Sequence, residues 1–301
     1  MKTTTLPPTI NLHNLVSCNY RCGFCYAGFA SAKRSRIPQS ELHEIIRQIG
    51  SLSRPTGIAA RKVTFAGGEP LLSPTAFEDI AFARTQGVVT SLVTNGSLLT
   101  EERILKLAPV LDWLTISIDS LKASTNDRIG RAARGVALSA DDYLARIRCA
   151  QALGIRTKIN TVVNQANAAE DFNAFIRVAR PRRWKLFQAT RIAEENGEDF
   201  GLWAISDETF RAFVARHADL SREGVVLVPE TQGDIYGTYA MVGPNGCFFD
   251  NSMGTYRYSR PIVSVGIKAA WSEITFSSDR FRARFGDYDF ATGINRKEVG
   301  Q

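Results

Sequence analysis

Strand-like and helix-like segments alternate along most of this chain of 301 residues. Short β-branched and apolar runs predict strands at 9–16, 62–65, 88–93, 113–118, 158–163, 183–189 and 225–228. Helical spacing and cap signals predict helices that begin at residues 40, 73 and 100, and others at 139–153, 170–179 and 206–217. This alternation is typical of parallel β/α architecture, here with about six or seven units, whose site forms at the carboxyl ends of the strands.

Local signals set the limits of several predicted helices. Ser40 is expected to cap the first helix, whose apolar face is formed by Leu42, Ile45, Ile46 and Ile49. Ser73 is expected to cap the second helix, with Pro74 in its first turn. Gly154 is expected to end the helix at 139–153.

The alternating pattern decays from residue 231 onward, where the sequence becomes rich in Gly, Tyr and Asn. We expect residues 1–230 to form the core. We expect residues 231–301 to be a C-terminal extension that covers the site within the same domain unit.

Composition and charge narrow the class of protein. The sequence has no apolar run of membrane-spanning length and no charged-then-apolar leader, so we expect a cytoplasmic monomer without a membrane span. The net charge of +7 is spread along the chain, which argues against general nucleic-acid binding. A small polyanion such as a nucleoside triphosphate would also need several convergent cations. Charge alone does not distinguish a protein that binds such a polyanion from one that binds nucleic acid.

Three of the five cysteines lie close together, in the array C-x3-C-x2-C formed by Cys18, Cys22 and Cys25 directly after the first predicted strand. Three thiolates are one short of a closed zinc site, whereas a cubane iron–sulfur cluster held by three thiolates leaves one iron open for a ligand. His13 is the nearby candidate for a fourth zinc ligand, but a lone strand histidine is more often structural. Cys149 and Cys247 are isolated and are predicted to be small buried hydrophobes.

Other unusual motifs also follow predicted strands. They are Gly67-Gly68-Glu69-Pro70, residues 94–97, Ser117 with Asp119, and Lys185, and we expect all of them at strand ends around one cavity. Two glycines let the main chain approach a ligand closely, and a nearby carboxylate suits a charged amino-acid group. The same four residues could also form only a tight turn.

The cysteine array, with Phe24 before its last cysteine and Gly-Gly-Glu-Pro further on, resembles the cluster loop and cofactor motif of radical S-adenosylmethionine (SAM) enzymes. Across the chain the order of motifs resembles the viperin family of nucleotide-modifying antiviral enzymes. The matching segments are 18–25, 62–70, 94–98, 116–120, 129–131, 158–160 and 183–188, with weaker similarity at 228–230 and 263–266.

The resemblance implies a partial (β/α)6 radical SAM barrel with a C-terminal extension that covers the site. It implies that Cys18, Cys22 and Cys25 ligate a [4Fe-4S] cluster. It places S-adenosylmethionine on Gly67, Gly68, Glu69, Ser117 and Arg131. It places a nucleotide on Asn11, Lys62, Lys158, Asn160, Arg183 and Lys185. Our alignment puts Asn245 where animal members have a tyrosine near the base, which leaves selectivity among CTP, UTP and GTP open.

The resemblance also implies an activity. A 5'-deoxyadenosyl radical would take the C4' hydrogen of a ribonucleoside triphosphate, and loss of the 3'-hydroxyl as water would give a 3'-deoxy-3',4'-didehydro nucleotide, an antiviral or anti-phage chain terminator. The electron would come from a reductase or a flavodoxin- or ferredoxin-type donor. The candidates for the proton donor are Tyr236, Tyr239, Cys247 and Tyr256.

The sequence departs from the family in the loop after Cys25 and at Ala66, where a serine is common. One alternative is another radical SAM enzyme, such as a cofactor-biosynthesis cyclase or a peptide maturase. These often carry more cysteines near the C-terminus, whereas only Cys247 lies beyond Cys149. A second alternative is a non-catalytic module that binds a metal or nucleic acid.

Overall fold

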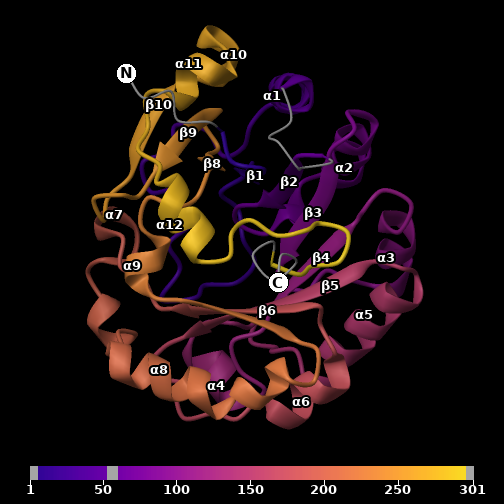
Figure 1. Cartoon of the computed structure of the whole chain (residues 1–301), viewed down its shortest axis with the longest axis vertical. Coiled ribbons are helices and arrows are strands. Elements are labelled where there is room, and N and C mark those ends of the chain that lie inside the picture. The colour runs from indigo at the N-terminus through magenta and orange to yellow at the C-terminus, as the bar shows by residue number, and fades with distance from the viewer. Residues whose placement is uncertain (1–5, 53–59, 296–301) are drawn as a thin grey trace.

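The computed structural model describes residues 6–52 and 60–295. In these residues the strands form one open ten-stranded sheet in the order β10-β9-β8-β1-β2-β3-β4-β5-β6-β7 (Figure 1). The strands are β1 (Thr9–His13), β2 (Lys62–Ala66), β3 (Val89–Thr94), β4 (Trp113–Ser117), β5 (Arg156–Val163), β6 (Arg183–Gln188), β7 (Val226–Glu230), β8 (Met241–Val242), β9 (Cys247–Asp250) and β10 (Arg257–Pro261). Strands β1 to β7 pair in parallel, which confirms the predicted β/α architecture.

Helices follow most of the parallel strands and lie outside the curved sheet, as Figure 1 shows most clearly for α5, α6 and α8. The helices are α1 (Gln39–Ser51), α2 (Ala76–Thr85), α3 (Glu101–Leu107), α4 (Ala123–Arg128), α5 (Ala140–Ala152), α6 (Asn173–Ala179), α7 (Ala193–Asn196), α8 (Asp207–Arg216), α9 (Gln232–Ile235), α10 (Ile262–Val265), α11 (Ile267–Trp271) and α12 (Ser278–Ala283). Among the described residues, no helix combines the length and the apolar character that crossing a membrane requires.

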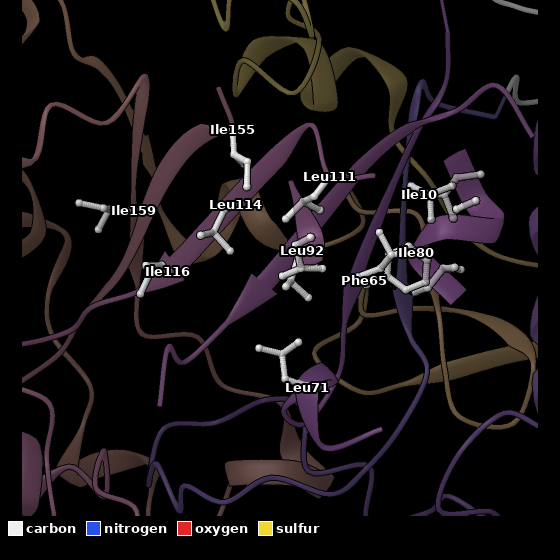
Figure 2. Packing of buried hydrophobic residues seen from close by; sticks show 14 of the residues in the cluster. Ile10, Phe65, Leu71, Ile80, Leu92, Leu111, Leu114, Ile116, Ile155 and Ile159 are labelled. Atoms are coloured by element: carbon white, nitrogen blue, oxygen red, sulfur yellow. The ribbon is translucent and has the colours of Figure 1, made fainter. Parts of the chain in front are cut away.

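The hydrophobic core lies between the outer face of the sheet and the helices. Alternate residues of each strand point outward, so Ile10, Leu92 and Leu114 pack in one buried cluster (Figure 2). The residues between them face the other way, toward the concave side. Polar residues on that side therefore do not disrupt the core.

Three predicted helix starts are wrong by a few residues, and one of them is that of helix α6, which begins at Asn173 and not at residue 170. Helix α1 begins at Gln39 after Pro38, so Ser40 lies inside the helix and does not cap it. Helix α2 begins at Ala76 after a 3₁₀ turn, η1 (Pro70–Leu72), and Ser73 and Pro74 lie between the two. Pro38 and Pro74 restrict the backbone just before α1 and α2, and each helix begins after its proline.

The region after residue 230 is more regular than its composition predicts. Strand β8 pairs in parallel with β1, and β9 and β10 continue the sheet in antiparallel fashion. After α12 the chain crosses the concave side of the sheet (Figure 1), where Trp113 donates to the carbonyl oxygen of Phe290 at 2.9 Å. Distant parts of the sequence therefore meet on the concave side.

Candidate active site

One cavity lies on the concave side of the sheet and is lined by the inward residues of β1 to β6. On β1 these are Thr9, Asn11 and His13, which alternate with the core residues Ile10 and Leu12. The same alternation directs residues of the neighbouring strands into the cavity, namely Lys62, Thr64, Ser91, Thr115, Ser117, Lys158, Asn160, Arg183 and Lys185. The alternation of side chains along each strand therefore brings together polar groups that are far apart in the sequence.

The strand-end position predicted for Lys185 is wrong. Lys62 and Arg183 are the first residues of their strands, and Lys158 and Lys185 are third in β5 and β6. The cavity therefore extends along the strands. The cysteines and the glycine turn follow strand ends, and most of the cations lie toward the strand beginnings.

The cysteine loop is held by a second turn of the main chain. The N–H groups of Arg21 and Gly23 donate to the carbonyl oxygens of Gly130 (3.0 Å) and Ile129 (3.2 Å). Gly130 has a φ of +78°, and a Cβ atom there would lie 2.0 Å from the carbonyl oxygen of Arg21. Glycine is therefore required where the two turns meet.

The three thiols of the loop line the cavity. The side chain of Arg131 lies 3.6 Å from Cys22 Sγ, and the amide nitrogen of Asn95 lies 3.9 Å from Cys18 Sγ. Burial raises the pKa of Cys22 to about 12, so this thiol needs the positive charge of a metal to act as a thiolate ligand at neutral pH.

The number of these thiols, three and not four, fits a cluster better than a closed zinc site. Among the described residues, no three His, Cys, Asp or Glu side chains are grouped closely enough for one metal ion. A zinc ion binds all its ligands at about 2.0–2.3 Å, whereas a cubane takes each thiolate at a separate iron. The ring of His13 packs edge-on against Phe29 and Phe249, which agrees with a structural role.

The glycine turn after β2 lies directly against the chain that leads into the cysteines. Gly67 has a φ of +125°, and a Cβ atom on Gly68 would lie 2.0 Å from the carbonyl oxygen of Ser17. The N–H of Gly68 donates to Leu15 O at 2.9 Å. The two glycines are therefore needed for contact between two segments of the protein, besides any approach to a ligand.

Glu69 has a different environment from the two glycines. Its carboxylate is fully buried and accepts hydrogen bonds from Leu71 N (3.1 Å), Thr94 Oγ1 (2.7 Å) and Asn95 N (2.8 Å). Gly67 is among the residues that line the cavity, but Glu69 is not. Glu69 therefore ties the end of β2 to the end of β3.

Arg131 connects the cysteine loop with the end of β4. Its guanidinium pairs with Asp119 at 2.9 Å, donates to the carbonyl oxygen of Ser117 at 2.6 Å and lies near Cys22. All four residues line the cavity, and the Arg131 side chain is buried. This charged pair forms the wall beside the thiols.

A cluster of cations lies toward the strand beginnings. The ammonium groups of Lys62 and Lys158 both donate to the hydroxyl of Tyr288, and Arg183 Cζ lies 4.1 Å from the centre of the Tyr288 ring. The charged neighbours that act most strongly on both lysines are other cations. Burial lowers the pKa of both lysines well below the usual value. A bound polyanion would relieve this repulsion.

Lys185 has a carboxylate partner that the sequence did not suggest. Glu230 is completely buried, and its carboxylate lies 2.5 Å from Lys185 Nζ and 3.0 Å from Arg284. Tyr239 donates to the same carboxylate at 2.5 Å and accepts from Lys185 at 2.7 Å. Burial lowers the pKa of Lys185 to about 8, although the charge of Glu230 acts in the opposite direction.

Some predicted site residues lie elsewhere. Of the described residues that line the cavity, none is Asn245, Tyr236, Cys247 or Tyr256. Asn245 Oδ1 accepts from the N–H of Lys33 at 3.1 Å. Tyr236 donates to a carbonyl oxygen at 2.7 Å, and Tyr256 donates to the carbonyl oxygen of Tyr26 at 2.6 Å. Tyr239 is the one candidate proton donor that lines the cavity.

Sequence reasoning missed four residues that take part in this site, namely Glu230, Asn251, Arg284 and Tyr288. Glu230 ends β7, which offers one local signal, since the ends of parallel strands tend to carry functional groups. The other three lie after residue 230, outside the named strands and helices, where no periodicity shows which side chains face the cavity.

Comparison with known proteins defines the class. The sequence profile of the Radical SAM superfamily matches residues 15–179, which include the cysteine loop, the glycine turn and Arg131. The fold is similar to that of "Native anSMEcpe with bound AdoMet", with a TM-score of 0.67 and 13% identity over 92% of this chain and 82% of that one. The chain belongs to the Radical SAM superfamily, whose members use a [4Fe-4S] cluster and S-adenosylmethionine.

Closer relatives define the family within this class. A protein from Flammeovirga pacifica is 38% identical over 94% of this chain and 96% of its own length. A protein from Lacinutrix mariniflava is also 38% identical, and this chain spans 60% of its length. A third, from Siniperca chuatsi, is 34% identical over 94% of this chain and 79% of its own length. All three are named S-adenosylmethionine-dependent nucleotide dehydratases, and this chain belongs to their family.

The expected resemblance to viperin is thus confirmed. The alternatives of a cyclase, a peptide maturase or a non-catalytic module are not favoured, because these relatives cover nearly the whole chain.

Proposed function

We propose that this protein converts a ribonucleoside triphosphate, namely CTP, UTP or GTP, to its 3'-deoxy-3',4'-didehydro analogue. The observation that carries the proposal is one cavity with three thiols near one end and Lys62, Lys158 and Arg183 near the other. A triphosphate needs several cations that converge from different strands, and its ribose would then lie toward the thiols. The names of the relatives support a nucleotide substrate.

Cys18, Cys22 and Cys25 would hold the [4Fe-4S] cluster. S-adenosylmethionine would lie beside them, against Gly67, Gly68, Ser117 and Arg131, with Glu69 supporting the turn from behind. Cluster and S-adenosylmethionine together supply a 5'-deoxyadenosyl radical, which removes the C4' hydrogen. The electrons would come from a reductase or from a flavodoxin- or ferredoxin-type donor.

The chain's own cations would hold the triphosphate. Phosphate oxygens would compete with the Tyr288 hydroxyl for the ammonium groups of Lys62 and Lys158, which already share that single acceptor. The amides of Asn11 and Asn160 face the cavity between the cations and the cysteine loop and suit ribose hydroxyls. Binding would thus fix the ribose and exclude water from it.

Tyr239 would help to supply the proton with which the 3'-hydroxyl leaves as water. Its hydroxyl already bonds Lys185, whose pKa near 8 allows the ammonium to replace a proton lost from the phenol. One proton and one electron then balance the loss of water from the C4' radical and the formation of the C3'=C4' double bond.

The test is an anaerobic assay of the reconstituted protein with S-adenosylmethionine and dithionite. Each of the four common ribonucleoside triphosphates is added separately, and 5'-deoxyadenosine and the nucleotide products are measured by mass spectrometry. We expect at least one triphosphate to stimulate 5'-deoxyadenosine formation and to give a product lighter by one water. If none raises 5'-deoxyadenosine above the level without nucleotide, the proposal fails.

A further inference from the structure

The lining of the cavity leaves one wall without an assigned role. The cations lie toward the strand beginnings, and the thiols and the glycine turn form the end near the carboxyl ends of the strands. The C-terminal part of the chain contributes Tyr239, proposed above to help supply a proton, and also Ile235, Met241 and Asn251, which have no role so far. A nucleoside triphosphate has three parts, namely triphosphate, ribose and base, and the base is the part for which no wall has yet been named.

Only one side chain of this wall has a polar group that is both fixed and available. Ile235 and Met241 offer no side-chain hydrogen-bond donor. The Tyr239 hydroxyl already bonds Glu230 and Lys185. Asn251 is buried, with 4% of its surface exposed, and it lines the cavity.

The orientation of the Asn251 amide is set by its partner. Its Oδ1 accepts from the main-chain N–H of Gly237 at 2.9 Å. A main-chain N–H can only donate, so the oxygen must face Gly237 and the Nδ2 group must point away from it. The carbonyl oxygen of Asn251 also accepts from Gly254 N at 3.0 Å. Among the hydrogen bonds of the described residues, the one that involves the Asn251 side chain uses Oδ1, and none has Nδ2 as its donor.

We propose that Asn251 Nδ2 donates a hydrogen bond to a carbonyl oxygen of the nucleobase and thereby contributes to base selection, an inference that rests on the proposed nucleotide dehydration. Uracil, cytosine and guanine each carry a carbonyl oxygen on the ring. Adenine carries none, and it presents an amino group, which is a donor, where guanine presents O6. A donor fixed opposite that carbonyl oxygen would face the amino group of adenine, which is also a donor, and would therefore discriminate against ATP.

This assignment replaces the one based on alignment. Asn245 lies outside the lining of the cavity, where its Oδ1 accepts from Lys33 and its carbonyl oxygen accepts from Arg34 at 2.8 Å. Asn251 is six positions further along the chain, beyond β9. Both residues are asparagines in the same region, so the chain provides its own matched comparison.

The test compares Asn251→Asp with Asn245→Ala in the reconstituted enzyme with S-adenosylmethionine. An aspartate keeps an oxygen for Gly237 and replaces the donor by an acceptor. For each variant, kcat/KM for 5'-deoxyadenosine formation and the equilibrium Kd are measured with CTP, UTP, GTP and ATP. The added negative charge weakens every triphosphate alike, so the ratios between bases report the contact with the base.

We expect the parent enzyme to use ATP least. We expect Asn251→Asp to lower kcat/KM for the preferred nucleotide by about 10-fold or more relative to ATP, as for a buried polar group left unpaired. Asn245→Ala should leave the ratios as they are. The same loss factor for all four nucleotides, or altered ratios in Asn245→Ala instead, would overturn the assignment.

Two further results separate the causes of failure. If Asn251→Asp does not fold, as judged from its iron content and melting temperature, the parent still tests the idea, because ATP as the best substrate would contradict it. If no nucleotide stimulates the parent enzyme, the proposed function has failed. Stimulation of the parent with unchanged ratios in the variant rejects only the role of Asn251.

Discussion

The two ends of the cavity are built in different ways. At the cysteine end, the cysteine loop and the glycine turn are short continuous segments, locked to their neighbours by main-chain contacts at Gly68 and Gly130. At the cation end, single residues from separate strands meet Tyr288 and Arg284 from the C-terminal region. The first end can therefore be recognised from sequence spacing, whereas the second exists only in the folded chain.

The largest effect should come from the cysteine end. Replacement of Cys22 by alanine removes one of three thiolates, so we expect loss of the visible absorbance of the cluster and of all 5'-deoxyadenosine formation. Nucleotide affinity, measured by calorimetry, should change little because the cations are untouched. Cys149→Ala, on α5 and outside the cavity, is the control and should retain the cluster. A normal spectrum in Cys22→Ala would contradict the ligand assignment.

At the cation end, we expect a substitution to weaken nucleotide binding and to leave the cluster in place. Lys158→Met removes an ammonium group from the cluster around Tyr288 but keeps much of the aliphatic volume. We expect nucleotide Kd to rise by about 10- to 100-fold, as for loss of a charge-assisted hydrogen bond, with unchanged iron content. Lys106→Met, at an exposed ion pair on α3, is the matched control. Equal affinity of the Lys158 variant and the parent would show that the triphosphate binds elsewhere.

A smaller effect should appear in the pH dependence of nucleotide binding. Lys185 has its pKa lowered to about 8, so its ammonium is charged below that pH and affinity should fall as the pH rises through about 8. The negative charge of Glu230 raises this pKa against the effect of burial, so Glu230→Gln should move the fall in affinity to lower pH.

The measurement for this variant is Kd between pH 6 and 9, a range of about one to two units on either side of the transition. Glu170→Gln is a useful control, because Glu170 is also buried but accepts from Ser120 away from the cavity. A transition that stays at the parental pH in Glu230→Gln would rule out Glu230 as the charge partner of Lys185.

The sequence was sufficient for the β/α alternation, because strand and helix periods are local and the strands pair in parallel as predicted. It was also sufficient to bring the three cysteines and Gly67 to one cavity. The predicted strands begin at Lys62 and Arg183, as the observed ones do. The extension of the cavity to these strand beginnings was missed, since a charged residue in a strand does not reveal how far along the sheet a cavity extends.

The C-terminal contribution could not be read from the sequence for another physical reason. Tyr288 reaches the lysines by way of a segment held by Arg183, which donates to the carbonyl oxygen of Gly293 at 2.5 Å. Such contacts depend on tertiary placement of irregular chain, and no repeat of two or 3.6 residues marks them. For the same reason the alignment placed Asn245 near the base, and Asn251 was not considered.

The order in which the two ends arise during synthesis follows from the contacts of Tyr288. A nascent chain that has reached residue 230 already contains the cysteines, the glycine turn and the parallel strands. It lacks the phenol that lies between Lys62 and Lys158. On the ribosome, the part that contains the three cysteines is therefore made before the part that completes the surroundings of the lysines.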